Sequence, residues 1–134
     1  MSANFEIIPL VSVGKIKFGT DRADVRNSLG DWREFKKNKF SKNTADDFGS
    51  CHVFYNAENK CVAVEFFRGN AALILNGQAL FSLDYDGIKS TIKAAHNNIE
   101  ADENGFTSAA LQLGVYAPSE NVEAILVADK GYYS

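Results

Sequence analysis

The 134-residue chain has few of the features that cross-link small proteins or anchor proteins in membranes. Its two cysteines, Cys51 and Cys61, are too few for a disulfide scaffold. No apolar run approaches the ~20 residues that a membrane-spanning helix needs. The opening residues lack the basic region and apolar core of a secretory signal. These absences predict a cytoplasmic protein with reduced thiols and no membrane partner.

Apolar residues make up 46% of the chain and charged residues 23%, which is an ordinary globular mixture. A chain of this length should bury about two-thirds of the surface that its unfolded form exposes. Ten Phe and five Tyr supply large core side chains. We therefore expect one domain, residues 1–134, that folds without a metal ion or cofactor.

Charge is divided unevenly along the chain, although the net charge is only −3. Residues 1–42 carry a net charge of +4, and residues 43–134 carry −7. If the two parts form separate faces, the second offers an acidic surface to a basic partner. The alternative is that these charges serve solubility alone.

Two helices are predicted from apolar spacing. Asp21 precedes Val25 and Leu29, which are one helical turn apart, and Gly30 supplies a stop, so residues 21–30 should form a short helix. A longer helix follows Asp84 or Asp86, either of which could cap it. Its apolar stripe consists of Ile88, Ile92, Ala95 and Ile99.

Most of the remaining chain has the pattern of strands. Residues 5–18 look extended, residues 51–55 and 61–67 flank a predicted hairpin turn, and Asn76-Gly77 is typical of a two-residue turn. A turn centred between Ala57 and Glu58 would place Cys51 opposite Val64, away from Cys61. The last strands are expected at 106–116 and 122–127, whereas 31–47 resembles a loop.

These elements predict an α+β fold, an antiparallel sheet with two helices on one face. A tandem strand-helix-hairpin repeat, with halves 5–67 and 73–130, is a further prediction. A shift of 63 residues places Asp21 on Asp84 and Val64 on Val127. Chance similarity is the alternative, because few identical residues support the shift.

Residues 13–30 read Val-Gly-Lys-Ile-Lys-Phe-Gly-Thr-Asp-Arg-Ala-Asp-Val-Arg-Asn-Ser-Leu-Gly. This run resembles the Gly-x-Ile-x-x-Gly opening, followed by Val-x-x-x-Leu-Gly, of the small lipoproteins of the outer-membrane assembly complex and of β-lactamase-inhibitor-protein-like domains. The resemblance implies tandem helix-plus-sheet architecture and protein binding on the sheet face. The chain lacks the lipid-attachment cysteine of the former and the paired disulfides of the latter, so no functional residue is carried over. In kind, a small acidic protein rich in aromatics is also similar to bacterial toxin-immunity proteins.

Candidate catalytic and metal sites are weak. Cys51, His52 and Cys61 are too few for a structural zinc site, and adjacent strand residues such as Cys51 and His52 point to opposite faces, which excludes a Cys–His pair between them. Asp47-Phe48-Gly49 matches the metal-binding motif of protein kinases, but the sequence lacks the other kinase motifs. The paired acids sit in loops or helix caps, where solvation and capping explain them.

The sequence therefore predicts a protein-binding module, not an enzyme, with an immunity or inhibitor role towards a basic toxin domain as its most specific form. Tyr85, Phe106 or Tyr116 would be the desolvated anchors of the interface. An alternative is a nucleic-acid or anion-binding module that uses the basic and aromatic stretch 32–42, although the overall acidity argues against nucleic acid. A small enzyme of unknown class is the third alternative. The expected partner-binding residues are Asp46, Asp47, Asp84, Tyr85, Asp86, Glu100, Asp102 and Glu103.

Overall fold

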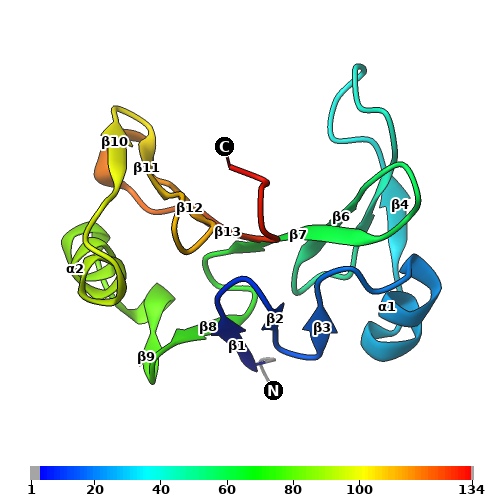
Figure 1. The fold of residues 1–134 in the computed structure, drawn as a ribbon, viewed down its shortest axis with the longest axis horizontal. Coiled ribbons are helices and arrows are strands. Elements are labelled where there is room, and N and C mark those ends of the chain that lie inside the picture. Colours follow the sequence, from blue (N-terminus) through cyan, green and yellow to red (C-terminus); the bar gives the residue numbers. More distant parts are fainter. Residues whose placement is uncertain (1–3, 134) are drawn as a thin grey trace.

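The computed structural model describes residues 4–133 as two β-sheets and two α-helices (Figure 1). The larger sheet has eight strands in the order β10-β11-β12-β13-β7-β6-β5-β4, and every neighbouring pair is antiparallel. Its strands are β4 (Arg33–Phe35), β5 (Ala45–Asp47), β6 (His52–Tyr55), β7 (Cys61–Phe67), β10 (Glu100–Asp102), β11 (Gly105–Ser108), β12 (Leu113–Tyr116) and β13 (Ala124–Ala128).

A smaller sheet with the order β3-β2-β1-β8-β9 lies beneath the larger one in Figure 1. It consists of β1 (Asn4–Ile8), β2 (Ser12–Val13), β3 (Ile16–Lys17), β8 (Ala72–Leu75) and β9 (Gln78–Ala79). The pair β1–β8 is parallel and joins segments that are distant in the chain. The turn residues determine where the β8–β9 hairpin reverses direction, because Asn76 and Gly77 both adopt the positive φ angles that a tight hairpin turn requires.

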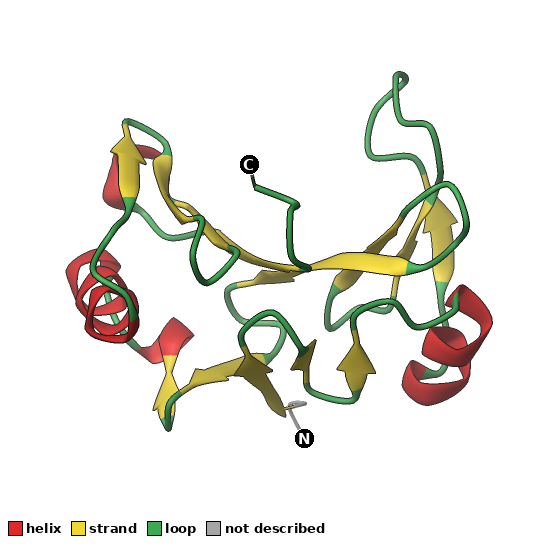
Figure 2. Ribbon diagram, in the orientation of Figure 1, coloured by secondary structure: helices red, strands yellow, loops and turns green. Residues whose placement is uncertain are grey.

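The helices α1 (Arg22–Leu29) and α2 (Tyr85–Ala95) flank the smaller sheet on the same side of the large one (Figure 2). Val25 of α1 and Ile88 of α2 belong to the single main core cluster, together with Phe66 of β7. Short 3₁₀ turns at Leu80–Ser82 and Pro118–Glu120 complete the elements. The predicted α+β fold, with an antiparallel sheet and two helices on one of its faces, is confirmed.

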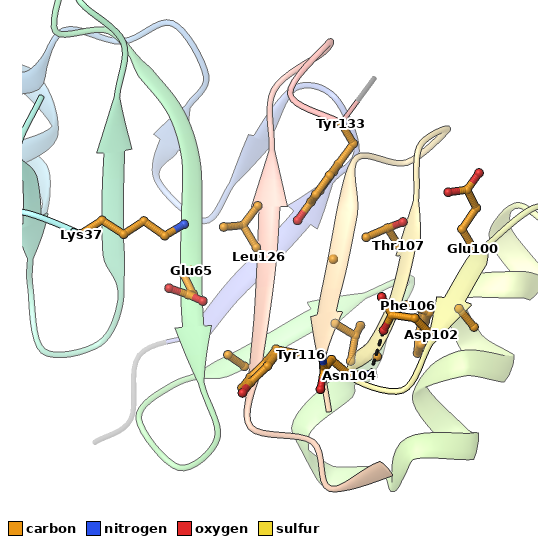
Figure 3. A pocket seen from close by; sticks show the side chains of 15 residues that line it. Lys37, Glu65, Glu100, Asp102, Asn104, Phe106, Thr107, Tyr116, Leu126 and Tyr133 are labelled. Carbon is orange, nitrogen blue, oxygen red and sulfur yellow. Dashed lines mark hydrogen bonds between the residues drawn. The ribbon is translucent and has the colours of Figure 1, made fainter. Parts of the chain in front are cut away.

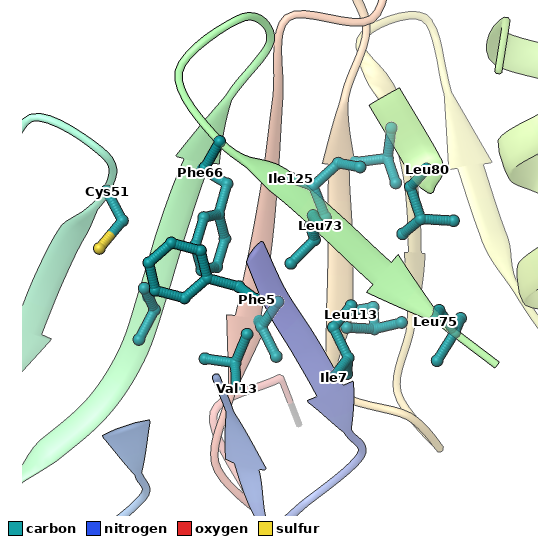
Figure 4. Close-up of a cluster of buried hydrophobic side chains, with 14 of the residues drawn as sticks. Phe5, Ile7, Val13, Cys51, Phe66, Leu73, Leu75, Leu80, Leu113 and Ile125 are labelled. Atoms are coloured by element: carbon teal, nitrogen blue, oxygen red, sulfur yellow. The ribbon is translucent and has the colours of Figure 1, made fainter. Parts of the chain in front are cut away.

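The core fills the space between the two sheets (Figure 4). Phe5 of β1 meets Phe66 of β7 with ring centroids 4.9 Å apart, and Leu73 and Ile125 are fully buried beside them. Burying side chains of this size contributes roughly 1.5–3 kcal/mol each, so the two sheets are held together mainly by apolar packing.

The β6–β7 hairpin forms as predicted, but its register differs from the prediction. Val53, and not Cys51, lies opposite Val64, and a bulge near Tyr55 places that residue opposite Cys61. Asn59 adopts a positive φ of 59° in the turn, so the loop is not symmetric about its centre. The irregular turn shifts the pairing by two residues.

An order of one helix followed by four antiparallel strands occurs twice, as α1 with β4–β7 and as α2 with β10–β13. The last strand of each set, β7 and β13, pair at the centre of the large sheet, where Val64 lies directly opposite Val127. These are the residues that a shift of 63 superimposes, so two halves related by a twofold axis would meet at this pair. The common origin of the halves stays a prediction.

Candidate functional site

The face of the large sheet that is turned away from both helices curves into a concave surface, with β10–β11 rising at one end and β4–β6 at the other (Figure 2). Successive strand pairings place one lateral row of residues across all eight strands of this face. In order, the row is Arg33, Asp47, His52, Glu65, Leu126, Gly114, Thr107 and Glu100.

A hollow of about 470 Å³ lies on the β10–β13 side of this surface (Figure 3). Small residues form part of its floor, namely Gly105, Gly114 and Ala124. Gly105 is irreplaceable on geometric grounds. A Cβ atom there would lie 1.9 Å from the carbonyl oxygen of Val115, and the φ of 137° disfavours any side chain.

Three carboxylates surround the hollow: Glu65 from β7, and Glu100 and Asp102 from β10. Tyr116 of β12 also lines it and is 50% exposed. Lys37 reaches in from the far end of the sheet as the single cation of the lining. The arrangement suits a cationic and partly apolar ligand, because acids supply charge and the tyrosine supplies contact area.

Tyr133 forms one wall of the hollow. Its backbone N–H donates to the Gln112 side chain at 2.7 Å, and the Gln112 amide donates in return to the Tyr133 carbonyl at 2.9 Å. A Cβ atom on Gly114 would lie 2.1 Å from the Tyr133 hydroxyl, so only glycine lets the ring lie in this position. Burial raises the pKa of Tyr133 to about 12.

Asp46 does not lie on this face, although we predicted that it would contact a partner. Its side chain is 0% exposed and points towards α1, where Arg22 and Arg26 approach it at 2.9 and 2.8 Å. The Tyr55 hydroxyl also donates to it at 2.9 Å. Burial alone would raise the pKa of this carboxyl, but hydrogen bonds from Arg26, Arg22 and Tyr55 outweigh it and hold the pKa at about 2. The cluster joins α1 to the sheet, and burial removes Asp46 from any docking surface.

The other predicted site residues fall into three separate places. Glu100 and Asp102 line the hollow, and Glu103 is exposed in the adjoining turn. Asp47 lies in the lateral row at the opposite end of the sheet, 3.5 Å from the His52 ring. The structure therefore brings together only part of the predicted acidic surface.

Asp84, Tyr85 and Asp86 belong to the start of α2, on the other side of the large sheet. The Asp84 carboxylate accepts from the Gly87 N–H at 2.8 Å, which makes it a helix cap. Tyr85 packs edge-on against Phe106, which is only 3% exposed and so cannot anchor a partner. Of the three predicted aromatic anchors, Phe106 and Tyr116 line the hollow, and of these two only Tyr116 is exposed.

Neither the thiols nor the histidines form a reactive cluster. Burial raises the pKa of Cys51 and Cys61 to about 12, so both remain protonated and poorly nucleophilic near neutral pH. His52 is packed between Phe35 and Phe67, with ring centroids 4.7 and 4.8 Å away. Within residues 4–133, no group of three or more His, Cys, Asp or Glu could hold a metal ion.

The basic and aromatic stretch 32–42 exposes two of its three aromatic rings. Phe40 is 82% exposed, and Trp32 is 49% exposed although the Arg26 guanidinium lies over its ring at 4.6 Å. Phe35 instead packs against His52 and Phe54. The stretch therefore offers few rings to a nucleic-acid strand, whose successive bases stack on several aromatics.

Sequence reasoning missed Glu65, Gly114 and Tyr133. The run Val64-Glu65-Phe66 contained a signal for the first, because an acid between two apolar strand residues must face the other side of its sheet. No local pattern indicates that Tyr133 lies on Gly114, because that contact depends on the path of the chain after β13.

Searches against family models, curated proteins and solved structures returned no match, so the function is argued from this geometry. Neither α1 nor α2 is long and apolar enough to cross a bilayer, and these are the α-helices of the described range 4–133.

Proposed function

We propose that this chain is a non-enzymatic protein-binding module of the immunity or inhibitor kind, whose concave sheet face docks a cationic segment of a toxin domain. The observation that carries the proposal is the hollow, which combines Glu65, Glu100 and Asp102 with the half-exposed Tyr116 over a floor of glycine and alanine. Such a surface would steer a basic partner by charge and hold it by burying the tyrosine.

The hollow favours a side chain or loop over a flat surface. Its volume of about 470 Å³ leaves room for a projecting lysine or arginine, which could enter and meet carboxylates from two sides. A guanidinium or ammonium group desolvated there would form charge-assisted hydrogen bonds, which are stronger than neutral ones. The buried, protonated thiols add support for a role without catalysis.

The test is binding to the product of a neighbouring gene that encodes a basic toxin domain, measured by isothermal titration calorimetry. We expect Glu65→Lys with Asp102→Lys to weaken binding at least a hundredfold, because both attraction and fit are lost. Asp84→Lys with Asp86→Lys changes the net charge equally but lies on the other side of the sheet, so it should have little effect. The opposite ranking of the two double variants would move the binding surface to α2 and refute the proposal.

The second candidate, anion or nucleic-acid binding, is favoured by one observation, the exposed lysines around Phe40. Fluorescence anisotropy with a single-stranded oligonucleotide at low salt tests it. Micromolar binding that falls steeply with added salt would favour it over the protein-binding role.

A further inference from the structure

The loop between β4 and β5 is a basic projection with one apolar side chain in its turn. Residues 36–44 contain no acidic residue, and their lysines, Lys36, Lys37, Lys39 and Lys42, are all exposed. None of these four forms an ion pair with any residue in the range 4–133. Phe40 lies in a turn that closes from Asn38 to Ser41 and is 82% exposed.

The hollow on the same face has the complementary character, and of the loop residues Lys37 lines its near edge. Glu65, Glu100 and Asp102 are likewise without an ion-pair partner in the described part of the chain, and Tyr116 presents an open ring. The volume of about 470 Å³ exceeds that of a phenylalanine side chain, so an aromatic tip flanked by lysines would fit it. Within one molecule the loop is already directed towards the hollow, since Lys37 extends towards Glu65 (Figure 3).

The loop 36–44 and the strands β10 and β11 beside the hollow rise at opposite ends of one concave surface, on the same side of the sheet (Figure 1). Two copies that face each other about a twofold axis lying between the two faces, parallel to the strands, would therefore place each loop over the partner's hollow. A twofold interface uses the same patch on both molecules, so a single complementary pair is satisfied twice.

We propose that a second copy of this chain occupies the concave face, with each copy inserting loop 36–44 and Phe40 into the hollow of the other. Phe40 packs against Tyr116 in this arrangement, and the lysines meet Glu65, Glu100 and Asp102. Because the contacts are mostly between exposed charges, the dimer is weak and sensitive to salt. The dimer hides the surface assigned to the toxin, so toxin and second copy compete for it.

Sedimentation velocity of the full chain tests the proposal directly. We expect dimers at 50 mM NaCl and a shift to monomers at 1 M NaCl, where the screening length falls to about 3 Å. Phe40→Ser should raise the dimer dissociation constant at least tenfold without changing the charge. A wild-type chain that stays monomeric at low salt up to about 1 mM overturns the proposal, and so does a set of larger open oligomers.

A charge exchange separates this interface from non-specific attraction. Lys39→Glu with Lys42→Glu removes the net positive charge of the loop, and Glu100→Lys with Asp102→Lys gives a basic hollow. Each double variant alone loses the charge attraction at both contacts and should be monomeric. An equimolar mixture pairs the unchanged basic loop of one variant with the unchanged acidic hollow of the other and should dimerise again.

Lys15→Glu with Lys93→Glu, which has the same net charge as the loop variant, is the matched control and should dimerise like the wild type. Failure of the mixture to dimerise contradicts the loop-in-hollow contact. Binding of a toxin is measured separately and can hold for a chain that is monomeric, so the two proposals fail independently.

Discussion

Asp46 shows what a single buried charge does in this fold. It is fully buried and receives hydrogen bonds from two arginines and a tyrosine. Replacing it by asparagine leaves Arg22 without a counter-charge and Arg26 with only the exposed Glu34, and breaking a buried ion pair from one side costs about 3 kcal/mol. We expect Asp46→Asn to lower the free energy of unfolding by about that amount in urea titrations. Asp47→Asn, at the half-exposed neighbour, should cost less than ~1 kcal/mol, and equal losses for the two would contradict this role.

The same carboxyl makes stability depend on pH in acid. The pKa of Asp46 falls from an ordinary 3.8 to about 2 on folding, so the folded state holds the charged form more strongly. The resulting stability is complete above pH ~4 and is lost as the pH falls towards 2. The gap between the two values corresponds to roughly 2 kcal/mol. Urea midpoints measured between pH 5 and 2 should fall less steeply in Asp46→Asn than in the wild type, and identical slopes would exclude Asp46 as the source.

Gly114 and Tyr133 give a third prediction at the scale of single residues. The added methyl group of Gly114→Ala would collide with the Tyr133 hydroxyl and push the ring into solvent. Because burial raises the pKa of Tyr133 to about 12, exposure should lower it towards the ordinary value of 10. Nuclear magnetic resonance of labelled tyrosine rings during a pH titration measures this change, and Tyr133→Phe identifies the signal. A ring that keeps its high pKa in the alanine variant contradicts the assigned contact.

At the scale of the elements, the two helices differ in how their first turns are capped. Asp84 accepts a hydrogen bond from the third residue after it, whereas the equivalent Asp21 makes no cap bond and instead pairs with Lys60. We therefore expect Asp84→Ala to lower the free energy of unfolding by about 1 kcal/mol and Asp21→Ala by less than about 0.5 kcal/mol. Thermal unfolding followed by circular dichroism compares the two. A larger loss for Asp21→Ala would mean that the pairing with Lys60 matters more than the cap.

Elements whose signals are local were predictable from the sequence. Both helices and the β6–β7 and β8–β9 hairpins follow from apolar spacing and turn residues close together in the chain. The short strands β4, β5 and β10 were not predicted, because most of their residues are polar. Pairing within the sheet, rather than their own composition, makes them strands. Residues 106–116 were expected as one strand but divide into β11 and β12 around a loop.

At the scale of the whole molecule, prediction was weakest because it depends on pairings between distant segments. The parallel contact of β1 with β8 creates the second sheet, and no local signal indicates it. Glu100 and Asp102 were predicted for the site, but their neighbour Glu65 joins them only through the pairings β7–β13–β12–β11–β10. Asp46 was misplaced for a related reason, since the register of β5 decides which of two adjacent acids is buried.

The position of Tyr133 on the concave surface has a practical consequence for handling the protein. Asn4 begins β1 in the smaller sheet, on the opposite side of the molecule, whereas the chain reaches Tyr133 inside the hollowed side (Figures 1 and 3). Any polypeptide fused after this residue would start where a ligand is expected to enter. A tag, fluorophore or sensor surface attached through the amino end would instead leave the entrance to the hollow open. A reporter attached at the carboxyl end would itself obstruct the hollow and so interfere with the binding that it is meant to measure.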